Sequence, residues 1–244
     1  MAERGVWLIV AQATAERTQA SARLGLTLRS VLLSPRAGFE GVFRATRRRE
    51  QAGARPAEGI APYVLAALGG SSLMLLWLKL GSLLGYRDVA RVEFRWSYLI
   101  VAAVAGALLA LFAQSLWGYV GAGAARAVDA QPPPRELRVV WGASAFPQII
   151  GLVLLLPLDL LIVGSDTFTS ERLSDPLATG WAALSIAFSL SLAVWSLFIF
   201  VRGVEVSASV SLLKALVLSF VGVAVLCAIV GGSIAGATAL AGGG

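Results

Sequence analysis

Long apolar runs alternate with short charged segments through the last three quarters of the chain. Five of these runs carry few or no charged residues, and each is at least as long as the roughly 20 residues that a helix needs to cross a bilayer. We therefore predict an all-α, polytopic membrane protein. Its five transmembrane helices are expected at residues 60–86, 96–125, 139–164, 176–201 and 211–238.

The first 59 residues follow another pattern and are predicted to form an arginine-rich cytoplasmic segment of amphipathic helices, before the five-helix domain of residues 60–244. Within 18–33, apolar residues recur at helical spacing on one face. That face is formed by Leu24, Leu28, Val31 and Leu32. The apolar run at 5–13 is interpreted as an interfacial or partner-facing helix, and the alternative is the core of a signal peptide.

A second amphipathic helix is predicted over Ser34–Glu50, because serine caps helices and the following proline fits the first turn. Its apolar stripe consists of Phe39, Val42 and Phe43. Such a helix is expected to lie along a membrane surface. The alternative is that the stripe packs against the protein's own spans or against a partner. The candidate contacts to lipid headgroups are Arg36, Arg44, Arg47 and Arg48.

Composition supports the membrane prediction and argues against an enzyme. Hydrophobic residues make up 57% of the chain and charged residues 14%, whereas soluble domains carry about 25% charged residues. The sequence contains no histidine and a single cysteine, which removes the commonest general base and metal ligand and any internal disulfide. We predict no catalytic, cofactor-binding or metal-binding residues. The acidic residues of 165–175 are interpreted as a solvated loop.

The net charge of +6 is distributed in a way that favours lipid headgroups over nucleic acid as the partner. Ten arginines precede residue 59, three lie in 126–138 and two basic residues lie in 202–214, which makes 15 on one side of the membrane and 4 in the opposite loops. By the positive-inside rule the N-terminus is expected to be cytoplasmic and the C-terminus external. The expected location is a bacterial plasma membrane.

Two charged residues lie inside the apolar runs, where a charge is costly and suggests a partner or a function. Lys79 and Asp159 fall at similar depths, several residues from the external ends of the first and third spans. We predict that they form an intramembrane pair. Pro157, beside Asp159, is expected to bend the outer end of the third span.

Rows of small residues in the spans are expected to let helices approach closely within the bundle, since lipid provides no hydrophobic drive for their association. Packing within one chain is favoured over a dimer interface, although a homo-oligomer is compatible with the pattern. The rows are Ala102, Gly106 and Ala110; Ser185, Ser189 and Ala193; and Ala228, Gly232 and Gly236.

Three segments resemble the bacterial branch of the Yip (Ypt-interacting protein) family of five-span membrane proteins. "LLSPRAGFEGVF" is similar to the proline-aromatic helix that precedes the first span, and "RELRVVWGASAFPQIIGLVLLLPL" to the third span with its basic loop. "WSLFIFVRGVEVSASVSLLKALVL" is similar to the short loop between the last two spans. The resemblance implies a five-span fold. Eukaryotic members act in vesicle traffic, and whether that role applies here stays open.

The expected function is that of an integral-membrane organising or adaptor protein, which binds other membrane proteins or lipid through its cytoplasmic face. A small transporter or permease-like subunit is the alternative. Polar residues at mid-depth would favour the alternative, and both Lys79 and Asp159 are predicted to lie off centre. The sequence does not identify a partner, a substrate or a lipid.

Overall fold

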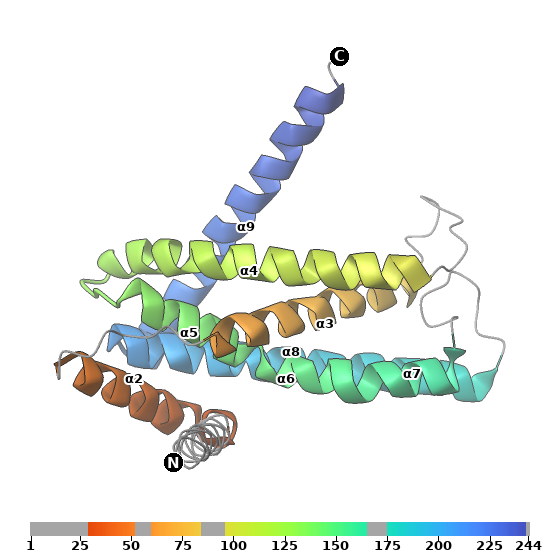
Figure 1. Ribbon diagram of the computed structural model, residues 1–244, viewed down its shortest axis with the longest axis horizontal. Helices are drawn as coiled ribbons and strands as arrows, with labels where there is room; N and C mark the ends of the chain where they lie inside the picture. The colour runs from red at the N-terminus through yellow and green to blue at the C-terminus, as the bar shows by residue number, and fades with distance from the viewer. Residues whose placement is uncertain (1–28, 52–59, 84–95, 165–174, 243–244) are drawn as a thin grey trace, which may run out of the picture. The chain divides into compact units, whose positions relative to one another are not determined.

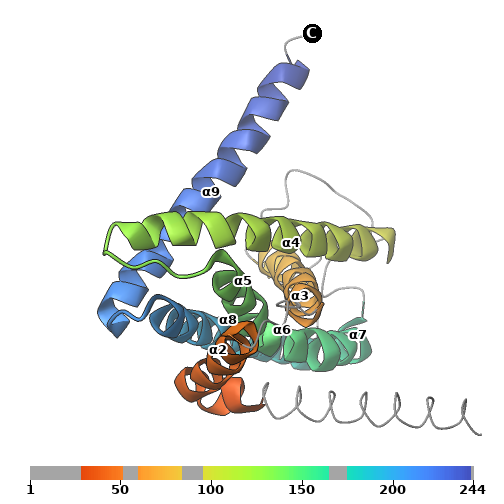
Figure 2. The same cartoon turned by 60° about the vertical axis from the view of Figure 1, so that its left-hand side comes forward.

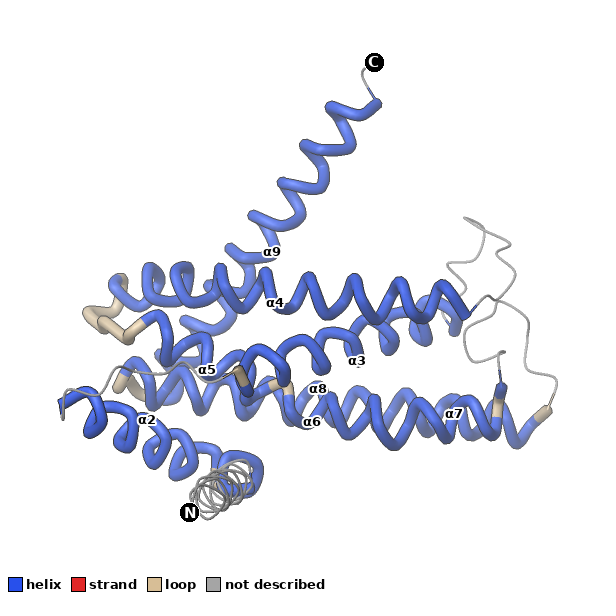
Figure 3. The backbone as a smooth tube through the Cα atoms, viewed as in Figure 1, coloured by secondary structure: helices blue, strands red, loops and turns tan. Residues whose placement is uncertain are grey.

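The structure is a computed structural model of the 244-residue chain, and it describes residues 29–51, 60–83, 96–164 and 175–242. Every regular element within these ranges is helical (Figures 1 and 3). The elements are α2 (Pro35–Gln51), α3 (Ala61–Leu83), α4 (Trp96–Arg126), α5 (Pro134–Ser144), α6 (Phe146–Ile150), the π-helical turn η1 (Gly151–Leu155), α7 (Leu156–Ile162), α8 (Pro176–Ala208) and α9 (Leu212–Gly242).

The chain divides into two compact units, Met1–Pro56 and Ala57–Gly244. The second unit contains five helical segments that are long and apolar enough to span a membrane, and the protein is therefore an integral membrane protein. The predicted all-α fold with five spans is confirmed. The segments are Ala61–Leu80, Ser97–Arg126, Pro134–Ile162, Pro176–Ala208 and Leu212–Ile229.

The first two spans cross at a point where only glycine fits. A Cβ atom on Gly70 would lie 2.4 Å from the backbone oxygen of Gly106, and one on Gly106 would lie 2.5 Å from that of Gly70. At the same crossing the Ser71 hydroxyl donates to the Ala103 carbonyl over 2.8 Å. Close backbone approach and a hydroxyl bond are what packing in lipid requires. The predicted small-residue row of the second span thus packs within the chain.

The third span is built from four short pieces, α5, α6, η1 and α7, because prolines interrupt its hydrogen bonds. Pro147 lies at the start of α6 and has no N–H for the preceding turn. Before Pro157 the helix widens, and the Leu156 N–H bonds to the Gly151 carbonyl, five residues back. A wider turn relieves the clash between a proline ring and the carbonyl four residues earlier. The sequence predicts a bend here, and the structure contains a π turn.

Two spans extend further into charged sequence than predicted. The third starts at Pro134, because proline suits the first helical position and Glu136 lies in the first turn. The fourth continues to Ala208, past the predicted end at residue 201. Its charges are accommodated because Arg202 donates to Glu205 over 2.9 Å within the same helix. The two helices therefore continue several residues past the predicted bounds of the spans.

The connections 127–133 and 209–211 lie at the same end of the bundle, on the left of Figure 1. α9 starts there, contacts α4 and α8, and extends beyond them in both views (Figures 1 and 2). At the opposite end, α8 begins with Asp175 as its cap: the carboxylate accepts from the Leu177 and Ala178 N–H groups over 3.1 and 3.3 Å. Asp175 is thus a helix cap, whereas Asp166 and Glu171 lie outside the described residues.

Candidate functional site

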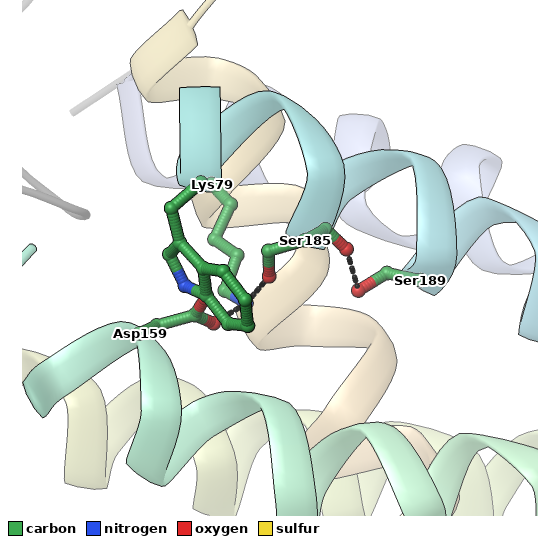
Figure 4. Close-up of polar contacts among 5 residues, drawn as sticks. Lys79, Asp159, Ser185 and Ser189 are labelled. Atoms are coloured by element: carbon green, nitrogen blue, oxygen red, sulfur yellow. Dashed lines mark hydrogen bonds and ion pairs between the residues drawn. The ribbon is translucent and has the colours of Figure 1, made fainter. Parts of the chain in front are cut away.

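The structure brings Lys79 and Asp159 together as a buried ion pair. Lys79 lies near the C-terminal end of α3, and Asp159 lies in α7. Only 6% of Lys79 and 1% of Asp159 are exposed, so both charges are shielded by protein. Figure 4 shows the two side chains pointing toward one another. Each residue alone would be a costly charge in an apolar environment, and together they form a neutral unit.

Helix α8 supplies the other partners of this pair. The indole N–H of Trp181 donates to the second carboxylate oxygen of Asp159 over 3.0 Å. Lys79 also donates to the Ser185 hydroxyl over 3.3 Å, and one turn further on Ser189 donates to the Ser185 carbonyl over 2.8 Å (Figure 4). We call Lys79, Asp159, Trp181 and Ser185 the polar cluster. It joins three spans, through α3, α7 and α8.

The arrangement contains a serine and a lysine within hydrogen-bond distance. Lys79 donates to both Asp159 and Ser185. These contacts position the three side chains relative to one another. No group of three metal-ligating side chains occurs in the part of the chain that the structure describes.

A small cavity adjoins the polar cluster. It lies between α3, α6, η1 and α8, and its volume is about 10 Å³, roughly enough for one water molecule. Its polar walls are formed by Ser72, Lys79, Gln148 and Ser189. Sequence reasoning missed Ser72 and Gln148, because single serine and glutamine residues inside an apolar run carry no charge. For Gln148, its position directly after the break at Pro147 was the available signal.

A second cluster lies toward the other end of the bundle, on α4, α5 and α8. We call Trp117, Trp141 and Phe200 the aromatic cluster; the three ring centroids lie 4.9 to 5.9 Å apart. Nearby in α4, the Gln114 amide donates to the carbonyls of Pro62 and Arg138. However, the Gln114 Oε1 and the Trp117 Nε1 are buried without a hydrogen-bond partner among the described residues. Packing, more than polar contact, holds this region.

In the first unit, the predicted helix is present as α2, and the phenylalanines of its apolar stripe are buried. Phe39 and Phe43 are 0% and 3% exposed, and their rings stack at 5.7 Å. Arg44, Arg47 and Arg48 are exposed, and Arg36 pairs with Glu40 on the surface over 3.1 Å. Both phenylalanines are therefore buried, and contact of this helix with a membrane surface stays a prediction. The segments 5–13 and 18–28 lie outside the described residues, and of Gly232 and Gly236 only the helical backbone is described.

Comparison of the chain with protein-family models, with curated proteins and with solved structures finds no match. The Yip resemblance therefore still depends on the three quoted segments.

Proposed function

We propose that this integral membrane protein organises other membrane components, as an adaptor that binds membrane proteins or lipid through its cytoplasmic face. The observation that carries the proposal is the closure of the polar interior. Lys79 and Asp159 pair with each other, Trp181 and Ser185 add one hydrogen bond to each of them, and the adjoining cavity has room for about one water molecule. Such an interior suits a rigid bundle whose outer surfaces do the binding.

The proposed orientation is N-terminus cytoplasmic and C-terminus external, in a bacterial plasma membrane. The two short connections of the bundle, 127–133 and 209–211, share one end, and basic residues flank both. Arg126 and Lys214 are exposed there. By the positive-inside rule this basic end of the bundle faces the cytoplasm, and the ten arginines that precede residue 59 indicate the same side for the N-terminus. Reporter fusions at the C-terminus should give an external signal.

Lipid contact is proposed through arginines. Arg44, Arg47 and Arg48 are exposed on α2, whereas the phenylalanines on its other face are covered. A basic residue near an anionic leaflet contributes about 1 kcal/mol, and salt weakens this attraction. We therefore expect electrostatic contact with headgroups rather than deep insertion. A Yip-like membership of this chain would agree with both parts of the proposal.

A transporter-like subunit is the second candidate, and one observation favours it. The third span is discontinuous near its middle, where Gln148 and η1 line the cavity, and broken spans often line the substrate sites of transporters. Reconstituted protein would then catalyse flux of a small solute, and Lys79→Ala would abolish it. Proteoliposomes with no flux above protein-free vesicles would leave the adaptor proposal.

Photocrosslinking in cells tests the adaptor proposal directly. A crosslinking amino acid at position 126 or 214, on the basic end, should give discrete protein adducts. Position 108, where Leu108 is 63% exposed on α4, is the matched control and should give mainly lipid adducts. Equal adduct patterns at all three positions would contradict a dedicated binding face.

A further inference from the structure

We propose that the cavity beside the polar cluster is a binding site for one uncharged, water-sized ligand, namely a water molecule that bridges Lys79 to Ser72. The cavity lies between α3, the π turn η1 and α8, inside the membrane-spanning unit. A ligand held there would join the first, third and fourth spans at a second point beside the ion pair.

The hydrogen-bonding groups around the cavity are incompletely used. An ammonium group has three N–H donors. Lys79 directs one to Asp159 and one to Ser185, which leaves the third for the cavity. Ser72 is 8% exposed and also lines the cavity. A ligand in the cavity can therefore bond to Ser72 and Lys79 together, and hydrogen bonds to a charged group are among the stronger ones in proteins.

The ligand must also donate. The Ser189 hydroxyl gives its proton to the Ser185 carbonyl, so its oxygen faces the cavity as an acceptor only. Gln148 gives an N–H to Ser196 over 3.4 Å and also lines the wall. Donors on one side and an acceptor on the other match a molecule with two hydrogens and two lone pairs. Water meets these needs with three partners, the usual number for a buried water.

Charge excludes an ion from this site. Lys79 and Asp159 already neutralise each other, and both are more than nine-tenths buried. A bound cation or anion would therefore leave one unpaired charge in a low-dielectric interior, which is strongly unfavourable. Volume leads to the same conclusion, because a cavity of about 10 Å³ accepts about one water and no larger solute.

Gly151 lines the cavity without a side chain, and a substitution at this position can test the proposed water site. A Cβ atom on Gly151 would lie 3.5 Å from both the Ser72 Oγ and the Leu192 Cδ1, which is ordinary contact distance. Gly151→Ala therefore fits without a clash and occupies part of the cavity. If the cavity were dry, alanine would stabilise the turn, because it fills space and is a better helix former than glycine. If a bridging water is displaced, the same change destabilises the protein.

The test is radiolytic labelling of the full chain in nanodiscs. Irradiation in heavy-oxygen water generates hydroxyl radicals from bound water, and these add oxygen to adjacent side chains. We expect labelling of Leu75 and Leu152, which line the cavity, and little labelling of Ile199, which is 0% exposed but lies elsewhere. Equal labelling of the three residues, or none at Leu75 and Leu152, would overturn the proposal without any variant.

The variant Gly151→Ala provides a second test of the bridging water. Labelling of Leu75 and Leu152 should be lost, and the Tm should fall by about 2 °C or more, as expected for a loss near 1 kcal/mol in a chain of this size. Unchanged labelling in the variant would mean that the radicals come from another source. A raised Tm would show that the cavity is dry, and either result refutes the bridging water.

Discussion

The two ends of the bundle join their helices by opposite means. In the polar cluster, α3, α7 and α8 meet through one ion pair, one indole N–H and one hydroxyl. In the aromatic cluster, α4, α5 and α8 meet through three rings, while the Trp117 N–H has no partner among the described residues. Directional hydrogen bonds hold the polar cluster together, and close packing of rings holds the aromatic cluster together. Different substitutions should therefore disrupt the two ends.

The largest effect is expected for the charges of the polar cluster. Lys79→Ala or Asp159→Ala leaves one buried charge unpaired, which should cost about 3–5 kcal/mol of folding free energy. Thermal unfolding in nanodiscs would measure the loss. The charge swap, with Lys79→Asp and Asp159→Lys combined, should recover part of the stability lost in either single reversal. Additive effects of the two reversals would mean that the residues do not interact.

The aromatic cluster should instead be sensitive to added volume. A Cβ atom on Gly222 would lie 2.5 Å from the Trp117 ring, so Gly222→Ala should destabilise the protein by about 1–3 kcal/mol. Gly123→Ala is the matched control, because nothing lies within 4 Å of its Cβ position. That variant should be neutral or more stable by up to about 1 kcal/mol. Equal loss in both would refute close packing of α9 on Trp117.

Two buried serines give the most direct comparison of the two ends. Ser185 and Ser219 are 2% and 1% exposed, but Ser185 accepts a bond from Lys79 whereas the Ser219 hydroxyl has no partner among the described residues. Ser185→Ala should cost about 1.5 kcal/mol, because a bond to a charged group is lost.

Ser219→Ala removes an unsatisfied hydroxyl and should be neutral or stabilising. The pair of variants would be measured by unfolding under identical conditions. A larger loss for Ser219→Ala than for Ser185→Ala would reverse the comparison between the two ends.

The smallest effect is expected outside the bundle, at the exposed pair of Arg36 and Glu40. Their side chains are 65% and 42% exposed, and surface pairs of this spacing contribute about 0.3–0.5 kcal/mol. Arg36→Ala should therefore change Tm little, and the change should shrink as salt is raised. A loss as large as that of Lys79→Ala would mean that Arg36 has another, buried role.

The sequence alone predicted the number of spans, because an apolar run of sufficient length is seldom found outside a transmembrane helix. It also placed Lys79 and Asp159 opposite each other, because a buried charge needs a partner and their depths agree. The remaining partners were not predictable in this way. Trp181 is one of seven tryptophans in the chain, and Ser185 is one member of a small-residue row. Their roles depend on the rotation of α8 about its axis.

Two helices continue past the predicted span ends for a simple reason. Arg202 and Glu205 neutralise each other along α8, so the helix does not have to end at the first charge. The sequence also could not place the phenylalanines of α2. Phe39 and Phe43 have the spacing of a lipid-inserting face and of a protein-packing face alike, and in the structure both are buried.

The π turn has a consequence for the length of the third span. Such a turn holds one residue more than a regular helical turn while it keeps the helix on either side in register. Removing one residue there, for example Val153, together with Pro157→Leu, would convert η1 into ordinary helix and still leave Asp159 facing Lys79. A deletion within α8 would rotate all later side chains by about 100°. Chains related to this one are therefore expected to differ in length at Gly151–Leu155 and to keep α8 constant.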